Sequence, residues 1–437
     1  MKNIYIRDLF LKKSGETVRI FGWISRKHIT SNFLFFDLVD STGQIQVFTS
    51  RESDIFLEAS KFQIETSVKV IGVLKNRKEG KFEIEIAKIE IIGNVDFSIS
   101  PSPRSNFNVF EPKYSDKVLS NRHLYLRNSK LAAVLKFRHV LLIFFRDWFE
   151  KHGFIEFNGP ILTELLLYED ENIAFNIDFF GKNVFLTQCM AFYLESAISA
   201  FEKVYCINPS FRAEKSRGKR YLAEYWHLKA EIAFADFEDI LRFVEEMIVF
   251  VFNRIKNETQ NEMATLEVES DLSLMNKLPF PRISYSDTIK ILKKKGHKIE
   301  FGKSLSDRNL KEIGKDFKTL FWITGLPRKT EPYPYLIDKY NRKLTKTADL
   351  ISHDGYGELL GIAEKIWTPK EFLERVKEKG KIIEKSNEWY YNLRRFGSVP
   401  HSGFGMGIER IIRFLLKLNH TRDAIAFPRL FKRNPNP

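Results

Sequence analysis

The chain has 437 residues, enough for two or three domains whose cores need no disulfides. Hydrophobic residues make up 43% of it and charged residues 29%, a balance that excludes a disordered chain and a membrane-spanning one. Lys and Arg number 70 against 56 Asp and Glu, and the net charge of +14 favours a polyanionic partner, although lysines that only solvate the surface would produce the same excess.

Targeting signals are not evident in the sequence. No apolar run approaches the length of a membrane span, and the first residues lack the apolar core of a signal peptide. The two cysteines, Cys189 and Cys206, are too few for a four-thiolate zinc site and suit a reducing compartment. We therefore expect a cytoplasmic protein with no membrane contact.

The first hundred residues predict a small β-barrel. Five short segments are rich in apolar and β-branched residues, and clusters of Gly, Ser, Asp and Lys separate them. They are residues 19–24, 33–38, 44–48, 68–73 and 82–86. Five such strands suit a barrel of the oligonucleotide-binding (OB) type over residues 1–100.

A second domain is expected over residues 129–437, after a linker of residues 101–128 that begins with a Pro- and Ser-rich stretch. Apolar residues at helical spacing predict a helix over 129–151 that ends at Gly153. The glycine-rich residues 403–407 are expected to open a last helix over 408–416. Further strand-like segments are 154–157, 184–186, 204–207, 227–234, 319–324 and 358–366, with another helix at 237–256. Because strands and helices do not alternate strictly, we expect an α+β domain with an antiparallel sheet and helices packed on it.

Two groups of residues suggest chemistry. Residues 210–231 concentrate basic side chains, among them Arg212 and Arg220, that could bind a polyphosphate, although a solvated hairpin would have the same composition. Asp349 and Glu358 flank a glycine-rich turn and could hold Mg²⁺, which prefers oxygen ligands.

Ordered motifs give a more specific interpretation. Phe211-Arg-Ala-Glu214 followed by Leu222-Ala-Glu-Tyr-Trp226 resembles motif 2 of the class II aminoacyl-tRNA synthetases. Residues 403–410 resemble motif 3, and residues 129–160 resemble motif 1. Residues 122–127, 280–285, 355–358, 397–403 and 420–429 resemble the asparaginyl-tRNA synthetases of archaea and eukaryotes. The resemblance spans nearly the whole chain.

The resemblance implies a catalytic antiparallel sheet with flanking helices, an N-terminal barrel that reads the anticodon of tRNA-Asn, and a homodimer formed through motif 1. It also implies ATP and Mg²⁺ as cofactors. Arg212 would bind the α-phosphate and the substrate carboxylate, and Tyr225 and Arg410 would lie on the two faces of the adenine. The implied sets are Arg212, Glu214 and Arg410 for catalysis; Arg212, Arg220, Tyr221, Tyr225, Glu358 and Arg410 for ATP; Asp349 and Glu358 for the metal; and Arg26, Phe35 and Gln46 for the anticodon. The alternation of residues along the predicted strand would also allow Phe35 to lie in the core of the barrel.

The implied amino-acid pocket favours asparagine over aspartate. Aspartate enzymes of this family carry a lysine at the position of Leu194, which has no charge here. Glu195 matches the asparagine type, where a carboxylate accepts from an amide and repels a carboxylate. The pocket set is Glu169, Gln188, Ala191, Leu194, Glu195, Lys229, Glu231, Gly361 and Lys365.

The sequence departs from the family inside this pocket. Ala191 stands where the family has glutamine and Lys229 where it has an acidic residue, and these groups would receive the α-ammonium of the substrate. Lys365 replaces an arginine of the family, and Ile362 replaces a glycine. Residues 169–171 read Glu-Asp-Glu where the family has Glu-Gly-Gly. In motif 2, Tyr221 replaces a histidine. A lysine ammonium at position 229 would repel the substrate ammonium, unless Lys229 points away or a nearby carboxylate compensates.

We therefore expect an ATP- and Mg²⁺-dependent ligase of the asparaginyl type, which forms an acyl-adenylate and transfers asparagine to tRNA. One alternative is a paralogue that adenylates another carboxylic acid or uses another acceptor. The second is a tRNA-binding or regulatory protein without catalysis, which the retained Arg212, Asp349, Glu358 and Arg410 argue against.

Overall fold

The structure is a computed structural model that describes residues 4–77, 81–166, 173–269 and 277–435. The chain forms two compact units, Met1–Leu131 and Ala132–Pro437. The predicted limits at residues 100 and 129 stay a prediction. Within residues 101–128 the chain is folded into short helices, η3 (Pro112–Tyr114), α2 (Ser115–Ser120) and α3 (Arg122–Tyr125), and Val118 and Tyr125 are buried together there.

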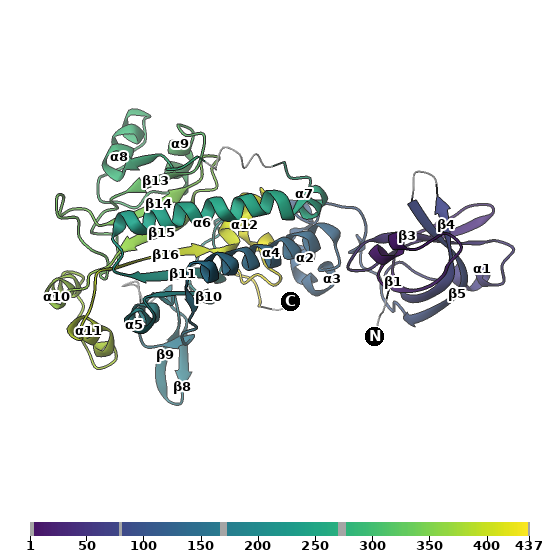
Figure 1. Ribbon diagram of the computed structural model, residues 1–437, viewed down its shortest axis with the longest axis horizontal. Helices are drawn as coiled ribbons and strands as arrows, with labels where there is room; N and C mark the ends of the chain where they lie inside the picture. Colours follow the sequence, from purple (N-terminus) through teal and green to yellow (C-terminus); the bar gives the residue numbers. More distant parts are fainter. Residues whose placement is uncertain (1–3, 78–80, 167–172, 270–276, 436–437) are drawn as a thin grey trace. The chain divides into compact units, whose positions relative to one another are not determined.

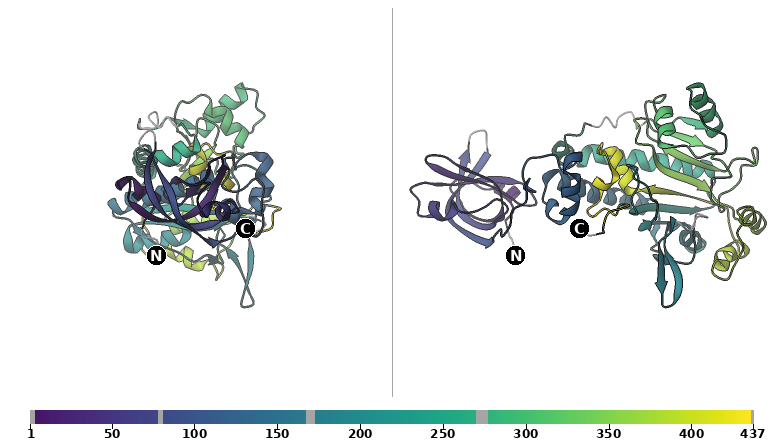
Figure 2. Two further views of the ribbon diagram at one scale, coloured as in Figure 1. Left: turned by 90° about the vertical axis from the view of Figure 1, so that its right-hand side faces the viewer. Right: turned by 180° about the vertical axis from the view of Figure 1, so that it is seen from behind.

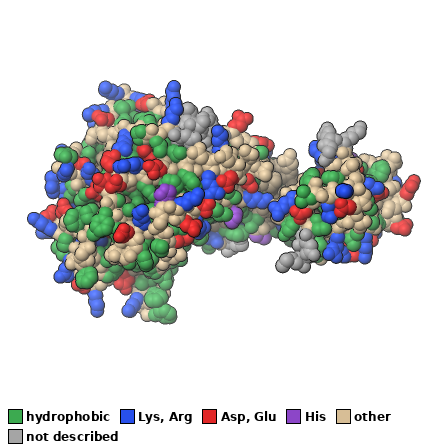
Figure 3. Space-filling view, viewed as in Figure 1, with side chains coloured by type: hydrophobic (Ala, Val, Ile, Leu, Met, Phe, Trp, Pro, Cys, Tyr) green, Lys and Arg blue, Asp and Glu red, His purple; other side chains and the backbone are tan. Residues whose placement is uncertain are grey.

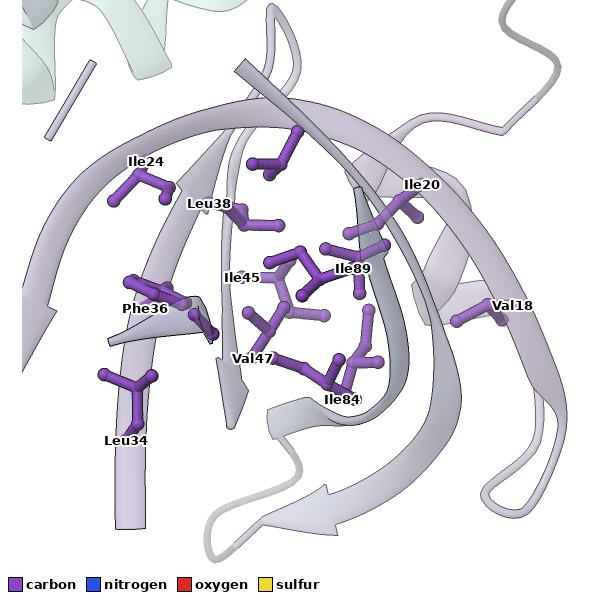
Figure 4. Close-up of a cluster of buried hydrophobic side chains, with 14 of the residues drawn as sticks. Val18, Ile20, Ile24, Leu34, Phe36, Leu38, Ile45, Val47, Ile84 and Ile89 are labelled. Atoms are coloured by element: carbon purple, nitrogen blue, oxygen red, sulfur yellow. The ribbon is translucent and has the colours of Figure 1, made fainter. Parts of the chain in front are cut away.

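The first unit contains a closed five-stranded barrel with the strand order β1-β2-β3-β5-β4, as the OB prediction requires (Figure 1). Its elements are η1 (Ile6–Leu11), β1 (Thr17–Ile29), β2 (Phe33–Val39), β3 (Gln44–Ser50), α1 (Ile55–Ala59), β4 (Ser67–Arg77) and β5 (Lys81–Gly93). Every second residue is buried in β2 and β3 and along most of β1 and β4, so that Ile20, Leu34 and Phe36 point into the barrel (Figure 4). The period of two therefore specifies which face of each strand forms the core.

The second unit is built on an eight-stranded sheet with the order β12-β13-β14-β15-β16-β11-β10-β6. These strands are β6 (Ile155–Glu156), β10 (Lys203–Phe211), β11 (Glu224–Ala233), β12 (Arg282–Ser284), β13 (Phe321–Thr324), β14 (Thr347–Ile351), β15 (Glu358–Glu364) and β16 (His401–Gly407). The pairs from β13 to β10 are antiparallel, as predicted, whereas β12 and β6 pair with their neighbours in parallel at the two ends. A smaller sheet has the order β7-β9-β8, with β7 (Leu162–Thr163), β8 (Asn176–Phe179) and β9 (Lys182–Leu186).

Helices cover this sheet, and Figures 1 and 2 show the two longest, α4 and α6, running along it. Arg254 of α6 forms an ion pair with Asp147 of α4, and Trp148 packs on Phe250 with ring centroids 5.1 Å apart. A capping box between Asp236 and Asp239 begins α6. The helices are α4 (Ser129–Lys151), α5 (Ala191–Phe201), α6 (Phe237–Glu258), α7 (Gln260–Leu266), α8 (Tyr285–Lys294), α9 (Asp307–Gly314), α10 (Pro369–Glu378), α11 (Glu388–Arg395), α12 (Ile408–Leu415) and η6 (Thr421–Ala424).

The last helix begins where the sequence predicts it, because α12 starts at Ile408 with Gly407 as its N-cap. The glycines of residues 403–407 themselves belong to strand β16, which directly precedes this helix. A Cβ atom at Gly403 would lie 2.1 Å from a carboxylate oxygen of Glu231, and one at Gly405 would lie 2.8 Å from the ammonium of Lys229. The glycines therefore leave room for charged side chains of the neighbouring strand β11.

Candidate active site

A cavity of about 680 Å³ opens in the second unit, over β11, β15 and β16 and the beginnings of α5 and α9. Most of the residues predicted from the sequence line it, although they come from distant parts of the chain. They are Ala191, Leu194, Arg212, Glu214, Arg220, Tyr221, Lys229, Glu231, Asp349, Glu358, Gly361, Lys365 and Arg410. Gln188 and Glu195 are buried without lining the cavity, and Glu169 lies outside the described residues.

Three guanidinium groups converge at one part of this cavity. Arg220 Nη2 lies 2.9 Å from Glu358 Oε2, and Arg410 Nη1 lies 3.0 Å from Glu358 Oε1. Arg220 also pairs with Asp307 at the start of α9. Arg212, at the end of the β10–β11 hairpin, contacts Glu214 at 3.5 Å. Several arginines around one space are suited to bind a polyphosphate through charge-assisted hydrogen bonds.

Tyr225 lies beside this cluster and not in the main cavity. It lines a small adjoining cavity together with Arg212 and Arg410. The guanidinium carbon of Arg212 is 5.7 Å from the centroid of the Tyr225 ring. Burial raises the pKa of Tyr225, and its buried hydroxyl has no hydrogen-bond partner among the described residues. An aromatic ring beside guanidinium groups is a suitable surface for a flat base.

Carboxylates crowd another part of the cavity. Burial, and then the charges of Glu358 and Glu331, raise the pKa of Asp349 well above its usual value. Burial and Glu358 likewise raise the pKa of Glu331 to about 7. Within the described ranges no group of three or more His, Cys, Asp or Glu has metal-binding geometry. Asp349 and Glu358 nevertheless fit Mg²⁺, which binds to proteins through one or two carboxylates and takes its remaining ligands from water and phosphate.

Buried charges form a network at the amino-acid end of the site. Lys365 Nζ lies 3.1 Å from Glu231 Oε2 and 3.5 Å from Glu195 Oε1. Burial disfavours the charged form of Glu195, but Arg394 and Lys365 outweigh it and hold the pKa of Glu195 well below its usual value. The cavity wall therefore presents a paired ammonium and carboxylate, Lys365 and Glu231.

Lys229 faces the cavity, so the structure rejects the alternative that it points away. It alternates with His227 and Glu231 along β11, all three residues line the cavity, and Lys229 is only 8% exposed. In the part of the chain that the structure describes, no carboxylate lies within 4.0 Å of its ammonium. Burial, and then the charge of Lys229, hold the pKa of His227 well below its usual value. The ammonium of Lys229 is therefore available to act on whatever occupies the cavity.

Several residues of the site were not predicted from the sequence. Glu331, Asp307 and Arg308 line the cavity, and Tyr390, Arg394 and His401 contact Glu195 from behind it. Of these residues, only His401 lies in a segment, residues 397–403, that resembles the asparaginyl-tRNA synthetases. The others come from α9, α11 and a loop, whose proximity to the site depends on tertiary packing.

The barrel carries the predicted anticodon residues on one surface. Arg26, Phe35 and Gln46, from β1, β2 and β3, line a shallow cavity of about 790 Å³ with His28 and Arg77. Phe35 is half-buried and packs against neighbouring aromatic rings on this outer face, while Phe36 occupies the core. The alternative that Phe35 is a core residue is therefore wrong.

Comparisons with known proteins agree with this geometry. Residues 115–431 match the family described as tRNA synthetases class II (D, K and N), and residues 18–92 match the OB-fold nucleic acid binding domain. The asparagine–tRNA ligase of Thermococcus gammatolerans is 35% identical over 432 residues, covering 98% of this chain and 97% of the relative. This chain belongs to the asparagine–tRNA ligase family of class II synthetases.

Solved structures of class II synthetases extend the comparison. The asparaginyl-tRNA synthetase from Pyrococcus horikoshii complexed with asparaginyl-adenylate has a TM-score of 0.92 and 34% identity, covering 99% of both chains. The asparaginyl-tRNA synthetase of Entamoeba histolytica has a TM-score of 0.87 and 25% identity. The predicted family and the predicted order, an OB-fold barrel followed by a class II synthetase domain, are confirmed. No helix of the described residues is long and apolar enough to cross a membrane.

Proposed function

We propose that this synthetase activates asparagine with ATP and transfers it to tRNA-Asn. The observation that carries the proposal is one cavity that contains both Arg212, Arg220 and Arg410 and the Lys365–Glu231 pair. The first group suits the phosphates of ATP and the second suits an amide side chain. Full-length similarity to asparagine–tRNA ligases favours this function over both alternatives.

The chain's own residues would promote adenylate formation by positioning and by charge. The carboxylate of asparagine attacks the α-phosphate in line, so no side-chain nucleophile is needed. Arg212 would neutralise charge on the transferring group, with Glu214 keeping its guanidinium in place, and Tyr225 and Arg410 would enclose the adenine. Arg220 would bind the outer phosphates, and Tyr221 lies next to it on the cavity wall.

Mg²⁺ would be held by Asp349 and Glu358. When bound, it would neutralise charge on the outer phosphates. The raised pKa of Asp349 supports this assignment, because a divalent cation relieves the repulsion between crowded carboxylates.

Lys365 and Glu231 would recognise the side chain of asparagine. An amide has an acceptor oxygen and a donor nitrogen, which match an ammonium and a carboxylate, whereas an aspartate side chain has only acceptors. Leu194 offers no charge to pair with aspartate, and Gly361 leaves space over Asp349, because a Cβ atom there would lie 3.0 Å from its carboxylate. Ala191 completes the wall of the proposed pocket, whereas Gln188 is buried and does not reach the cavity.

The barrel would bind the anticodon of tRNA through Arg26, Phe35 and Gln46. Its outer aromatic cluster offers rings on which bases can stack, and Arg26 and Arg77 supply positive charge beside it. On the face drawn in Figure 3, Lys and Arg side chains lie among acidic ones, so we expect contacts at several points and not one basic patch.

The synthetase would act as a cytoplasmic homodimer formed through residues 129–160. Strand β6 lies at the end of the large sheet, and Ile155 on it and Ile143 on α4 are exposed apolar side chains. Ile155→Asp should therefore shift the sedimentation coefficient from dimer to monomer. Both cysteines are free thiols, as a reducing compartment requires.

Pyrophosphate exchange across a panel of amino acids and other carboxylic acids tests the proposal. We expect exchange with asparagine and none for Arg212→Ala or Glu358→Ala, while Arg242→Ala, an exposed residue of α6, serves as the control. Exchange with a different acid alone would indicate the paralogue. A chain that binds tRNA but neither ATP nor Mg²⁺ in calorimetry would indicate the non-catalytic alternative.

A further inference from the structure

Helix α11 reaches the amino-acid end of the site from behind. It packs on α5 and α10 through Tyr390, whose ring centroid is 4.7 Å from that of Phe192 and 5.5 Å from that of Phe372. Tyr390 and Arg394 do not line the cavity, and both are buried. Any effect of theirs on a substrate must therefore pass through another residue.

That residue is Glu195, whose two oxygens have different partners. Oε2 is contacted by the guanidinium of Arg394, accepts from the hydroxyl of Tyr390 at 2.7 Å and lies 3.3 Å from Nε2 of His401. Among the described residues, Oε1 has only the longer contact of 3.5 Å with Lys365. Arg394 therefore draws Glu195 away from Lys365, whose shorter contact is with Glu231.

Arg394 is itself fixed on several sides. Its Nη2 donates to the Tyr390 hydroxyl at 3.0 Å, and its Nε donates to the carbonyl of Ile366 at 3.1 Å. Ile366 directly follows Lys365, so one guanidinium group holds both the carboxylate beside Lys365 and the backbone next to it. The side chains of Arg394, Glu195 and Lys365 are at most 4% exposed, so water cannot replace a lost partner.

We propose that Tyr390 and Arg394 are positioning residues for asparagine: they hold Glu195 so that Lys365 stays paired with Glu231 at the cavity wall, ready for an amide. This inference rests on the proposed function. Without Arg394, the buried Glu195 would compete with Glu231 for Lys365, and the donor and acceptor that match the amide would be displaced.

The test compares Arg394→Met, Arg394→Lys and Tyr390→Phe with the wild type in asparagine-dependent pyrophosphate exchange. Arg395→Met is the matched control, because Arg395 lies on the same helix and is exposed. We expect KM for asparagine to rise about tenfold or more in Arg394→Met, with KM for ATP unchanged, because breaking a buried charge pair costs more than the ~1.4 kcal/mol of a tenfold change. In Arg394→Lys, KM for asparagine should rise less than in Arg394→Met, because a positive charge is retained. Tyr390→Phe should also raise KM for asparagine less than Arg394→Met does.

The pH profile separates positioning from a general loss of structure. In Arg394→Met, Glu195 loses the main cation that keeps it ionised, while Lys365, His401, Tyr390 and Glu231 still face it. Burial then raises the pKa of Glu195 with less opposition, and its protonation at lower pH would end the competition for Lys365, so the ratio of variant to wild-type KM for asparagine should rise as the pH is raised. In Arg394→Lys the ratio should stay flat.

Equal increases of KM for ATP and of KM for asparagine would overturn the inference. An unchanged KM for asparagine in both Arg394→Met and Tyr390→Phe would also overturn it. In either case, asparagine-dependent exchange by the wild type would still support the proposed function. If Arg394→Met does not fold, Arg394→Lys and Tyr390→Phe decide by the same criteria. Absence of asparagine-dependent exchange in the wild type would overturn the proposed function and this inference together.

Discussion

Lys229 is a buried ammonium group in a cavity that we propose binds an α-amino acid. Together with Ala191 it occupies positions where the family resemblance leads us to expect acceptors for the substrate ammonium. The structure puts both residues on the wall of the same cavity. The charge at position 229 should therefore weaken asparagine binding.

The double change Lys229→Glu with Ala191→Gln should lower KM for asparagine by about tenfold or more, because it replaces a repulsive charge with two acceptors. Each single change should do less, since the two sites share one ligand group. Pyrophosphate exchange at fixed ATP measures the effect. A loss of exchange in the double variant would show that the wild-type pocket compensates for Lys229 by other means.

Glu331 gives a prediction about stability. Its pKa is raised from 4.5 to about 7, so the fold favours the neutral acid. The contribution of Glu331 to stability is therefore greatest below its unfolded pKa of 4.5, and it falls as the pH rises toward the folded value of about 7. At a pH above about 7, the raised pKa of Glu331 lowers the free energy of unfolding by about 3 kcal/mol.

Glu331→Gln removes this penalty and should raise the thermal midpoint at pH 8 by about 5 °C in the absence of Mg²⁺, with little change at pH 5. Calorimetric scans at the two pH values provide the measurement. Equal midpoints for wild type and variant at pH 8 would contradict the burial argument.

At the scale of one element, strand β2 carries two adjacent phenylalanines with different tasks. Phe36 is fully buried in the barrel core, and Phe35 lies on the outer face beside Arg26 and Gln46. The strand period of two separates them completely.

Phe36→Ala should destabilise the barrel by about 3–5 kcal/mol, the usual cost of removing a buried aromatic ring. Phe35→Ala should leave stability nearly unchanged and weaken tRNA binding by about 1–3 kcal/mol, the value of one stacked base. Denaturation and filter-binding titrations of the two variants form a matched pair. Unchanged tRNA affinity in Phe35→Ala would remove this face of β2 from the proposed anticodon site.

At the scale of the whole molecule, the net charge of +14 is the dominant property. Binding to a polyanion releases counterions, so the affinity for tRNA should fall steeply and linearly in a plot of log K against log salt concentration. A chain without residues 1–100 should bind tRNA more weakly and with a shallower slope. Equal affinity of the shortened chain would mean that the barrel has another role.

The sequence by itself determined the barrel strands, the helix over residues 129–151 and the set of residues around Arg212 and Arg410 that we propose binds phosphate. The strands and the helix follow from the spacing of apolar residues along the chain, and the residues around Arg212 and Arg410 follow from short sequence motifs. Tertiary structure alone decided that Lys229 faces the cavity, that Glu331 joins the carboxylates, and that Arg394 stands behind Glu195, 199 residues away in the chain. Local patterns carry no information on such contacts, because the direction of a buried charge depends on which distant partners packing brings within a few ångströms of it.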